Sequence, residues 1–140
     1  MEKDLNRFVE AQENDYEVAL AEIKSGRKRS HWMWYIFPQL KGLGYSDTSK
    51  YYAISDSDEA KDFLYHPILG ERLREISAAI LQLEQNDANE VMGSPDDLKL
   101  KSSMTLFAEI DETEDSVFEK VLEKFFKGHS DNKTINLLKK

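Results

Sequence analysis

Cysteine is absent from this chain, and proline and glycine are sparse, with three prolines and six glycines in 140 residues. Without cysteine the protein has no disulfide framework, no thiolate nucleophile and no cysteine-bound metal. No apolar run approaches the roughly 20 residues that a membrane-spanning helix needs. We therefore expect a cytoplasmic protein without a membrane partner.

Negative charge exceeds positive charge. The chain has 27 acidic and 19 basic residues, for a net charge of −8. General nucleic-acid binding needs a broad positive surface, so this composition argues against extended nucleic-acid binding. The bases are nevertheless uneven: Lys24, Arg27, Lys28 and Arg29 contribute +4, which leaves −12 on the rest of the chain. A local positive spot on an acidic body suits a small anion better than a long polyanion.

The spacing of the hydrophobic residues is helical almost throughout. With 40% hydrophobic and 33% charged residues, the chain has the composition of one soluble domain with its own core. We predict an all-α fold in which residues 1–140 form a single compact domain of short and medium helices, without a sheet of three or more strands. The clearest apolar helical face comprises Leu69, Leu73, Ile76, Ile80 and Leu83.

Several helix ends are also predicted from local signals. Asn14 and Asp15 are expected to divide the first helical segment in two, Ser57 to cap a short helix, and Pro67 to open a longer one. The run WMWYIF, residues 32–37, is predicted to be a short buried helix ended by Pro38. A buried strand is the alternative, since aromatic residues favour strands, but no partner strand is evident.

The segment GRKRSHWMWYIFPQ, residues 26–39, is the most informative part of the sequence. Three basic residues directly precede His31 and both tryptophans, Trp32 and Trp34. Guanidinium groups bind phosphate or carboxylate through paired hydrogen bonds, and tryptophan faces stack on bases or cations. The segment therefore predicts a pocket for a small anionic ligand, phosphorylated or nucleotide-like.

A second segment, GSPDDLKLKSSMTLF at residues 93–107, is the most apolar partner for the first that also carries polar residues. We expect the two segments to meet, with His31 or Trp34 in contact with Lys99, Ser102 or Ser103. The predicted ligand-binding residues are Arg27, Lys28, Arg29, His31, Trp34, Lys99 and Ser103.

Candidates for catalysis are few, and an enzymatic role is left open. His31 is a candidate general acid–base, and Lys99 beside Ser102 or Ser103 resembles the pairing that activates a serine nucleophile. His66, which precedes Pro67, is expected to be structural. Three scattered histidines without a motif such as HExxH predict no metal site, and no cofactor is indicated.

Two other interpretations stay open at this point. In the first, the basic residues 27–29 form a solvated turn that pairs with acids elsewhere. In the second, the whole basic-aromatic patch is a non-catalytic interaction module. Such a module would dock an acidic protein partner or a nucleic-acid end. Shape distinguishes these functions, because a small-molecule site is concave and a docking patch is flat and exposed.

Three motifs carry a resemblance to a known family. They are GRKRSHWMWYIFPQ, the segment HPILG at residues 66–70, and GSPDDLKLKSSMTLF. The chain resembles the bacterial domain of unknown function 1810 family, sometimes labelled calpastatin-like, from Asp4 almost to its end. The resemblance implies an all-helical fold and no particular activity. The calpastatin-like label finds no support in the sequence, which predicts a compact fold rather than an extended inhibitor.

Overall fold

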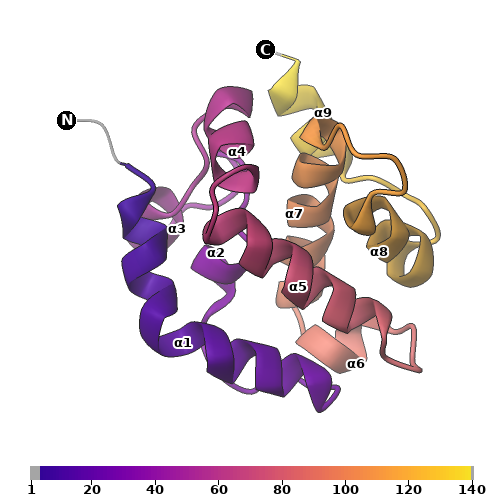
Figure 1. Cartoon of the computed structure of the whole chain (residues 1–140). Helices are drawn as coiled ribbons and strands as arrows, with labels where there is room; N and C mark the ends of the chain where they lie inside the picture. Colours follow the sequence, from indigo (N-terminus) through magenta and orange to yellow (C-terminus); the bar gives the residue numbers. More distant parts are fainter. Residues whose placement is uncertain (1–3, 140) are drawn as a thin grey trace.

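The computed structural model describes residues 4–139, and this part of the chain contains nine helices and no strand. The predicted all-α fold is therefore confirmed for these residues (Figure 1). The helices are α1 Asn6–Lys24, α2 Met33–Ile36, α3 Asp47–Tyr51, α4 Ser57–Leu64, α5 Leu69–Leu81, α6 Ala88–Met92, α7 Asp96–Ile110, α8 Val117–Phe126 and α9 Asn132–Leu138.

Helix α7 runs through the core. It packs against α4, α6, α8 and α9, and its buried residues include Leu100, Met104 and Phe107. Helix α5 crosses the molecule between α1 on one side and α8 on the other (Figure 1). Burial of apolar area at roughly 25 cal/mol per Å² makes these contacts the main source of stability.

The apolar face predicted for residues 69–83 is present. Leu69, Leu73, Ile76 and Ile80 of α5 are all buried, whereas Leu83 lies beyond the end of the helix. The 3.6-residue period places these side chains on one stripe, which faces the core.

The predicted break at Asn14 and Asp15 is wrong, because α1 is continuous from Asn6 to Lys24. A single Asn or Asp inside a helix costs well under about 1 kcal/mol. Tyr16 and Ala19 are buried on the same helix, and the Tyr35 hydroxyl donates a hydrogen bond to the Asp15 carboxylate. Tertiary contacts therefore keep the helix intact.

Two predicted helix starts are displaced. Asp56, not Ser57, caps α4, and its carboxylate accepts a hydrogen bond from the Glu59 backbone N–H at 2.9 Å. Helix α5 begins at Leu69 rather than at Pro67. His66 caps α5, because its Nδ1 accepts hydrogen bonds from the backbone N–H groups of Ile68 at 3.1 Å and Leu69 at 3.2 Å. The predicted structural role of His66 is confirmed.

The aromatic run at residues 32–37 does form a helix, but only one turn of it. Helix α2 begins at Met33 because Trp32 has a non-helical φ of −136°, and it ends before Pro38. Trp32 and Phe37 flank the turn and are 1% and 0% exposed. Within the described residues the only strand-like contact is an isolated parallel bridge between Leu40 and Ile54.

That bridge places the loop after α2 beside the segment that joins α3 to α4. The Lys41 N–H donates to the Ile54 carbonyl at 2.7 Å, and the Ile54 N–H donates to the Gln39 carbonyl at 2.8 Å. The loop after α2 and the segment between α3 and α4 therefore lie side by side.

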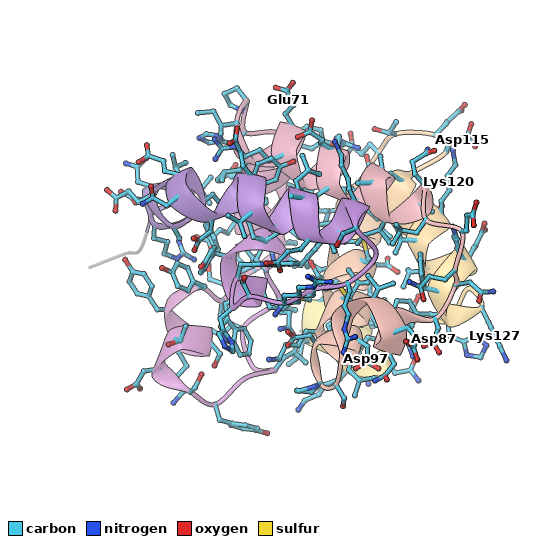
Figure 2. The ribbon with its side chains drawn as sticks, turned by 90° about the horizontal axis from the view of Figure 1, so that it is seen from below. Glu71, Asp87, Asp97, Asp115, Lys120 and Lys127 are labelled. Carbon is cyan, nitrogen blue, oxygen red and sulfur yellow. The ribbon has the colours of Figure 1, made fainter. Side chains whose placement is uncertain are left out.

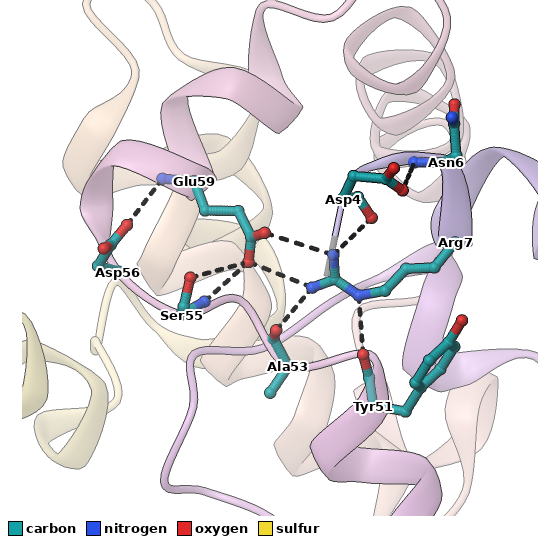
Figure 3. A network of polar contacts seen from close by, with 8 residues as sticks. All are labelled: Asp4, Asn6, Arg7, Tyr51, Ala53, Ser55, Asp56 and Glu59. Atoms are coloured by element: carbon teal, nitrogen blue, oxygen red, sulfur yellow. Dashed lines mark hydrogen bonds and ion pairs between the residues drawn. The ribbon is translucent and has the colours of Figure 1, made fainter. Parts of the chain in front are cut away.

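Arg7 ties the start of α1 to the same region (Figure 3). It is only 5% exposed, and it donates hydrogen bonds to the carbonyls of Asp4 at 2.7 Å, Tyr51 at 2.7 Å and Ala53 at 2.9 Å. An ion pair of 3.2 Å joins it to Glu59. A buried guanidinium needs this full set of acceptors to offset its desolvation. In contrast, charged side chains such as Glu71, Asp115 and Lys127 point outward into solvent (Figure 2).

Candidate functional site

Side chains alternate between solvent and protein along residues 27–32. The exposed members are Arg27, Arg29 and His31, and those turned toward the protein are Lys28, Ser30 and Trp32. The three consecutive basic residues therefore do not form one clamp, because the middle one points the opposite way. The helix predicted for the aromatic run begins only at Met33, after these basic residues.

Glu22, on the last turns of α1, holds the inward-facing part of the segment. Its carboxylate accepts hydrogen bonds from the Arg29 N–H at 2.7 Å, the Ser30 N–H at 2.9 Å and the Trp32 indole Nε1 at 2.9 Å. Burial raises the pKa of Glu22, but these bonds and the one from the Ser30 hydroxyl favour the charged form and bring the pKa to about 2. The Glu22 carboxylate therefore holds residues 29–32 in place against α1.

Lys28 and Lys99 share a single carboxylate. Lys28 Nζ lies 2.8 Å from Asp96 Oδ2, and Lys99 Nζ lies 3.1 Å from Asp96 Oδ1. Each ammonium also lies over a tryptophan ring, Lys28 at 4.9 Å from the centroid of Trp32 and Lys99 at 4.1 Å from that of Trp34. Burial raises the pKa of Asp96, and the two lysines lower it by more.

The predicted meeting of the two sequence segments is confirmed by the contact of Trp34 with Lys99. Asp96 already partners both lysines of the expected anion site. Two cations around one carboxylate leave the cluster with one net positive charge. A ligand role for Lys28 and Lys99 stays a prediction.

The other predicted residues lie in separate environments. Arg27, Arg29 and His31 are exposed, and the two arginines have no ion-pair partner within residues 4–139. The Ser102 hydroxyl lies 3.2 Å from both the Leu98 carbonyl and the Asp131 carboxylate. The Ser103 hydroxyl is buried and has no hydrogen-bond partner among the described residues. The catalytic roles suggested for His31, Lys99 and Ser102 remain predictions.

Trp34 also borders a cavity of about 960 Å³. It is bounded by the start of α1, the loop after α2, α3 and the start of α4. Its lining includes Asp4, Leu5, Arg7, Trp34, Gln39, Leu40, Lys41, Gly42, Gly44, Tyr45, Ser49, Lys50, Tyr52, Ala53, Ser55, Asp56, Asp58, Glu59 and Asp62. Of the predicted ligand-binding residues, only Trp34 belongs to this lining.

Gln39 is the most informative residue of the cavity wall. It is 8% exposed, and its Nε2 has no hydrogen-bond partner in the part of the chain that the structure describes. Its backbone carbonyl is occupied by the Ile54 N–H at 2.8 Å. A buried donor without a partner costs about 1–3 kcal/mol. Nε2 itself has almost no accessible surface, so an acceptor in the cavity would meet it, and recover that free energy, only after the amide turns about its last side-chain bond.

The charge of the cavity wall is mainly negative. Arg7 and Glu59 neutralise each other at 3.2 Å. The remaining acids, on the α1 start and on α4, outnumber the remaining bases; they are Asp4, Asp56, Asp58 and Asp62 against Lys41 and Lys50. This wall differs from the cationic pocket predicted from the sequence.

Gly44 lets the loop after α2 approach α3 closely. A β-carbon at Gly44 would lie 2.5 Å from the Ser49 hydroxyl oxygen and 2.6 Å from its β-carbon, and 3.5 Å from Cη2 of Trp34. Ser49 is itself buried, at 4% exposure. Any larger residue at position 44 would therefore displace the loop or Ser49, whereas the distance to Trp34 is an ordinary contact.

Sequence reasoning missed the residues of this cavity other than Trp34. Gln39 stood at the end of the predicted motif, and a polar residue directly after Pro38 and a dense apolar run was the available signal. The carboxylates of α4 gave none, because acids in the first turn of a helix are expected from the helix dipole alone.

Two features are absent from residues 4–139. Within that range no group of three or more His, Cys, Asp or Glu side chains is arranged to hold a metal ion. None of the helices described combines the length and the apolar character required to cross a bilayer.

Comparison with known proteins places this geometry in a family. The chain is 44% identical to the conserved hypothetical protein Rv1873 from Mycobacterium tuberculosis, whose crystal structure it matches with a TM-score of 0.94. The match covers 98% of this chain and 97% of that one. A search among curated proteins finds no match. Residues 2–138 match the family described as "Protein of unknown function (DUF1810)", as the sequence motifs indicated, and the chain belongs to that family.

Proposed function

We propose that this protein binds a small, planar, hydroxyl-bearing molecule of the nucleoside type in the cavity beside Trp34. The observation that carries the proposal is the side chain of Gln39, a residue of the cavity lining, whose buried Nε2 lacks a partner among the described residues and would gain one if the amide turned toward a ligand. An amide of this kind pairs with the polar edge of a heterocycle, and an indole ring stacks on its face.

The volume and the wall chemistry support the same class of ligand. At about 960 Å³ the cavity lies in the range of small-molecule sites. Carboxylates accept hydrogen bonds from hydroxyl groups, and Asp56, Asp58 and Asp62 of the α4 region lie in the wall. The same carboxylates repel a phosphate. The proposal is therefore for a nucleoside-type ligand rather than a phosphorylated one.

Thermal unfolding with a ligand panel tests the proposal. The panel holds the four ribonucleosides, their 5′-monophosphates and ribose, and a ligand at 100 times its Kd stabilises the fold by about 2.7 kcal/mol. We expect one nucleoside to raise Tm, its monophosphate to raise it less, and Gln39→Leu and Trp34→Leu to abolish the shift. A panel without any shift, or a shift that survives both substitutions, would contradict the proposal.

A second candidate is an interaction module that docks an acidic protein segment through Arg27, Arg29 and His31. The observation that favours it is that these side chains share the solvent-facing side of residues 27–31. The nearby acids do not pair with them, because Glu22 binds Trp32 and Asp96 binds Lys28. The double variant Arg27→Gln/Arg29→Gln separates the two candidates. It leaves nucleoside binding unchanged under the first and abolishes binding of a poly-glutamate peptide under the second.

A further inference from the structure

We infer that Lys99 sets the charge selectivity of the cavity by occupying one face of Trp34, so that the ligand ring must be uncharged rather than cationic. This inference names the ligand class of the proposed site and rests on that proposed function. It assigns Lys99 a positioning and selectivity role in place of the direct anion contact predicted from the sequence.

The geometry begins with the two faces of the indole. Lys99 Nζ lies 4.1 Å from the centroid of the Trp34 ring, which places the ammonium over one face. That face is closed to a ligand. Trp34 also lines the cavity, so a bound ring meets it through the other face or the edge.

Asp96 holds Lys99 in this position without cancelling the charge of the cluster. Its two carboxylate oxygens bind Lys28 at 2.8 Å and Lys99 at 3.1 Å. Two ammonium groups and one carboxylate leave one net positive charge, which is shared between Lys99 over Trp34 and Lys28 over Trp32. An indole face attracts cations through its quadrupole, but here a second cation would also meet this positive charge across the ring. A neutral heterocycle stacks without that penalty.

The carboxylates of the cavity wall favour a cationic ligand, which opposes the effect proposed for Lys99. Asp4, Asp56, Asp58 and Asp62 would attract a cationic group placed against them. None of them is paired with Lys99, whose carboxylate partner is Asp96. Replacing Lys99 therefore changes the charge behind Trp34 and leaves the acidic wall unchanged.

The first test uses ions as probes and needs no ligand. Trp34 is partly exposed and Trp32 is 1% exposed, so collisional quenching of fluorescence reports Trp34. At constant ionic strength, iodide and caesium quenching are measured for the wild type and for Lys99→Met, which keeps an apolar stem but removes the charge. We expect the iodide-to-caesium ratio of quenching constants to fall about twofold in Lys99→Met.

Two control variants make this test specific. Lys99→Arg keeps the positive charge and the capacity to stack on an indole, so it should keep the wild-type ratio. Trp34→Phe should remove most of the quenchable signal, which identifies its source. A ratio that does not change in Lys99→Met would overturn the inference, whatever the binding measurements give.

The second test compares guanosine with 7-methylguanosine, which carries a positive charge on the same ring. We expect the wild type to bind guanosine more tightly and Lys99→Met to reduce this preference about fivefold, within the range of a cation–π contact. An unaltered preference would overturn the inference. If neither compound binds the wild type while the quenching ratio falls as expected, the proposed nucleoside function fails and the electrostatic role of Lys99 stands.

Discussion

The indole Nε1 of Trp32 donates a hydrogen bond to Glu22 at 2.9 Å, and this bond joins the most distinctive segment of the sequence to helix α1. The same carboxylate accepts bonds from the backbone N–H groups of Arg29 and Ser30. One acidic side chain thus organises a basic segment that, in sequence, looks like a binding motif.

Glu22→Gln should destabilise the fold by about 2 kcal/mol at neutral pH, because charge-assisted hydrogen bonds lose their charged acceptor. The pKa of Glu22 is about 2 in the folded protein against 4.5 ordinarily. A lowered folded-state pKa means that the contribution is fully present above about pH 4.5 and is lost as pH falls toward 2. Urea unfolding of both proteins from pH 7 to pH 2 checks this, since the difference in unfolding free energy should shrink across that window. A difference that stays constant to pH 2 would contradict the role of the charge.

Asp96→Asn should destabilise the protein more than Lys28→Met does. The first change leaves Lys28 and Lys99 close together without a carboxylate, whereas the second leaves the Lys99–Asp96 pair intact. Breaking a largely buried ion pair costs about 3–5 kcal/mol when one charge remains unpaired. We expect about 3 kcal/mol for Asp96→Asn and about half of that for Lys28→Met. Chemical denaturation gives both values, and the reverse order would count against a shared carboxylate.

Gly70→Ala should prevent normal packing of α4 on α5. A β-carbon at Gly70 would lie 1.8 Å from the Leu64 carbonyl oxygen, and backbone cannot move aside as a flexible side chain does. Overpacking of this severity costs about 3 kcal/mol or more. Thermal unfolding followed by circular dichroism measures the loss.

Gly128→Ala is the matched control for that variant. Gly128 has a φ of +79°, and no described atom beyond the glycine and its two chain neighbours lies within 4 Å of the place that an alanine methyl group would take. Alanine there costs only the strain of a left-handed conformation, which is about 1–2 kcal/mol. Equal losses in the two variants would show that the close approach of Gly70 to Leu64 is not the cause.

His66→Ala should cost about 1 kcal/mol, because α5 loses the side chain that accepts from the N–H groups of Ile68 and Leu69. His66→Asn should recover most of this, since an asparagine oxygen caps in the same way. Both values come from chemical denaturation. If the asparagine variant is as unstable as the alanine variant, capping does not explain the position.

Much of the fold follows from local chemistry. The apolar stripe of α5 depends on spacing, and Ser46 and Asp131, which cap α3 and α9, are of the residue types that favour this position. The break expected at Asn14 and Asp15 failed for a different reason. A weak local preference there is outweighed by burial of Tyr16 and by the bond from Tyr35 to Asp15.

The candidate site, too, was predicted in part from the sequence and decided in part by the tertiary structure. Sequence alone predicted that residues 26–39 and 93–107 would meet, and Trp34 does contact Lys99, but the apolar run of α2 packs mainly against α1 rather than against α7. Only the tertiary structure decided the partners of each charge. Asp96 is far from Lys28 in sequence, and nothing in the sequence separates Glu22 from the other acids near it. Hydrogen bonds require atoms within about 3 Å in a fixed geometry, which only the folded chain supplies. The cavity beside Gln39 likewise exists only because Arg7 and the Leu40–Ile54 bridge bring three separate segments together, an arrangement that no local spacing records.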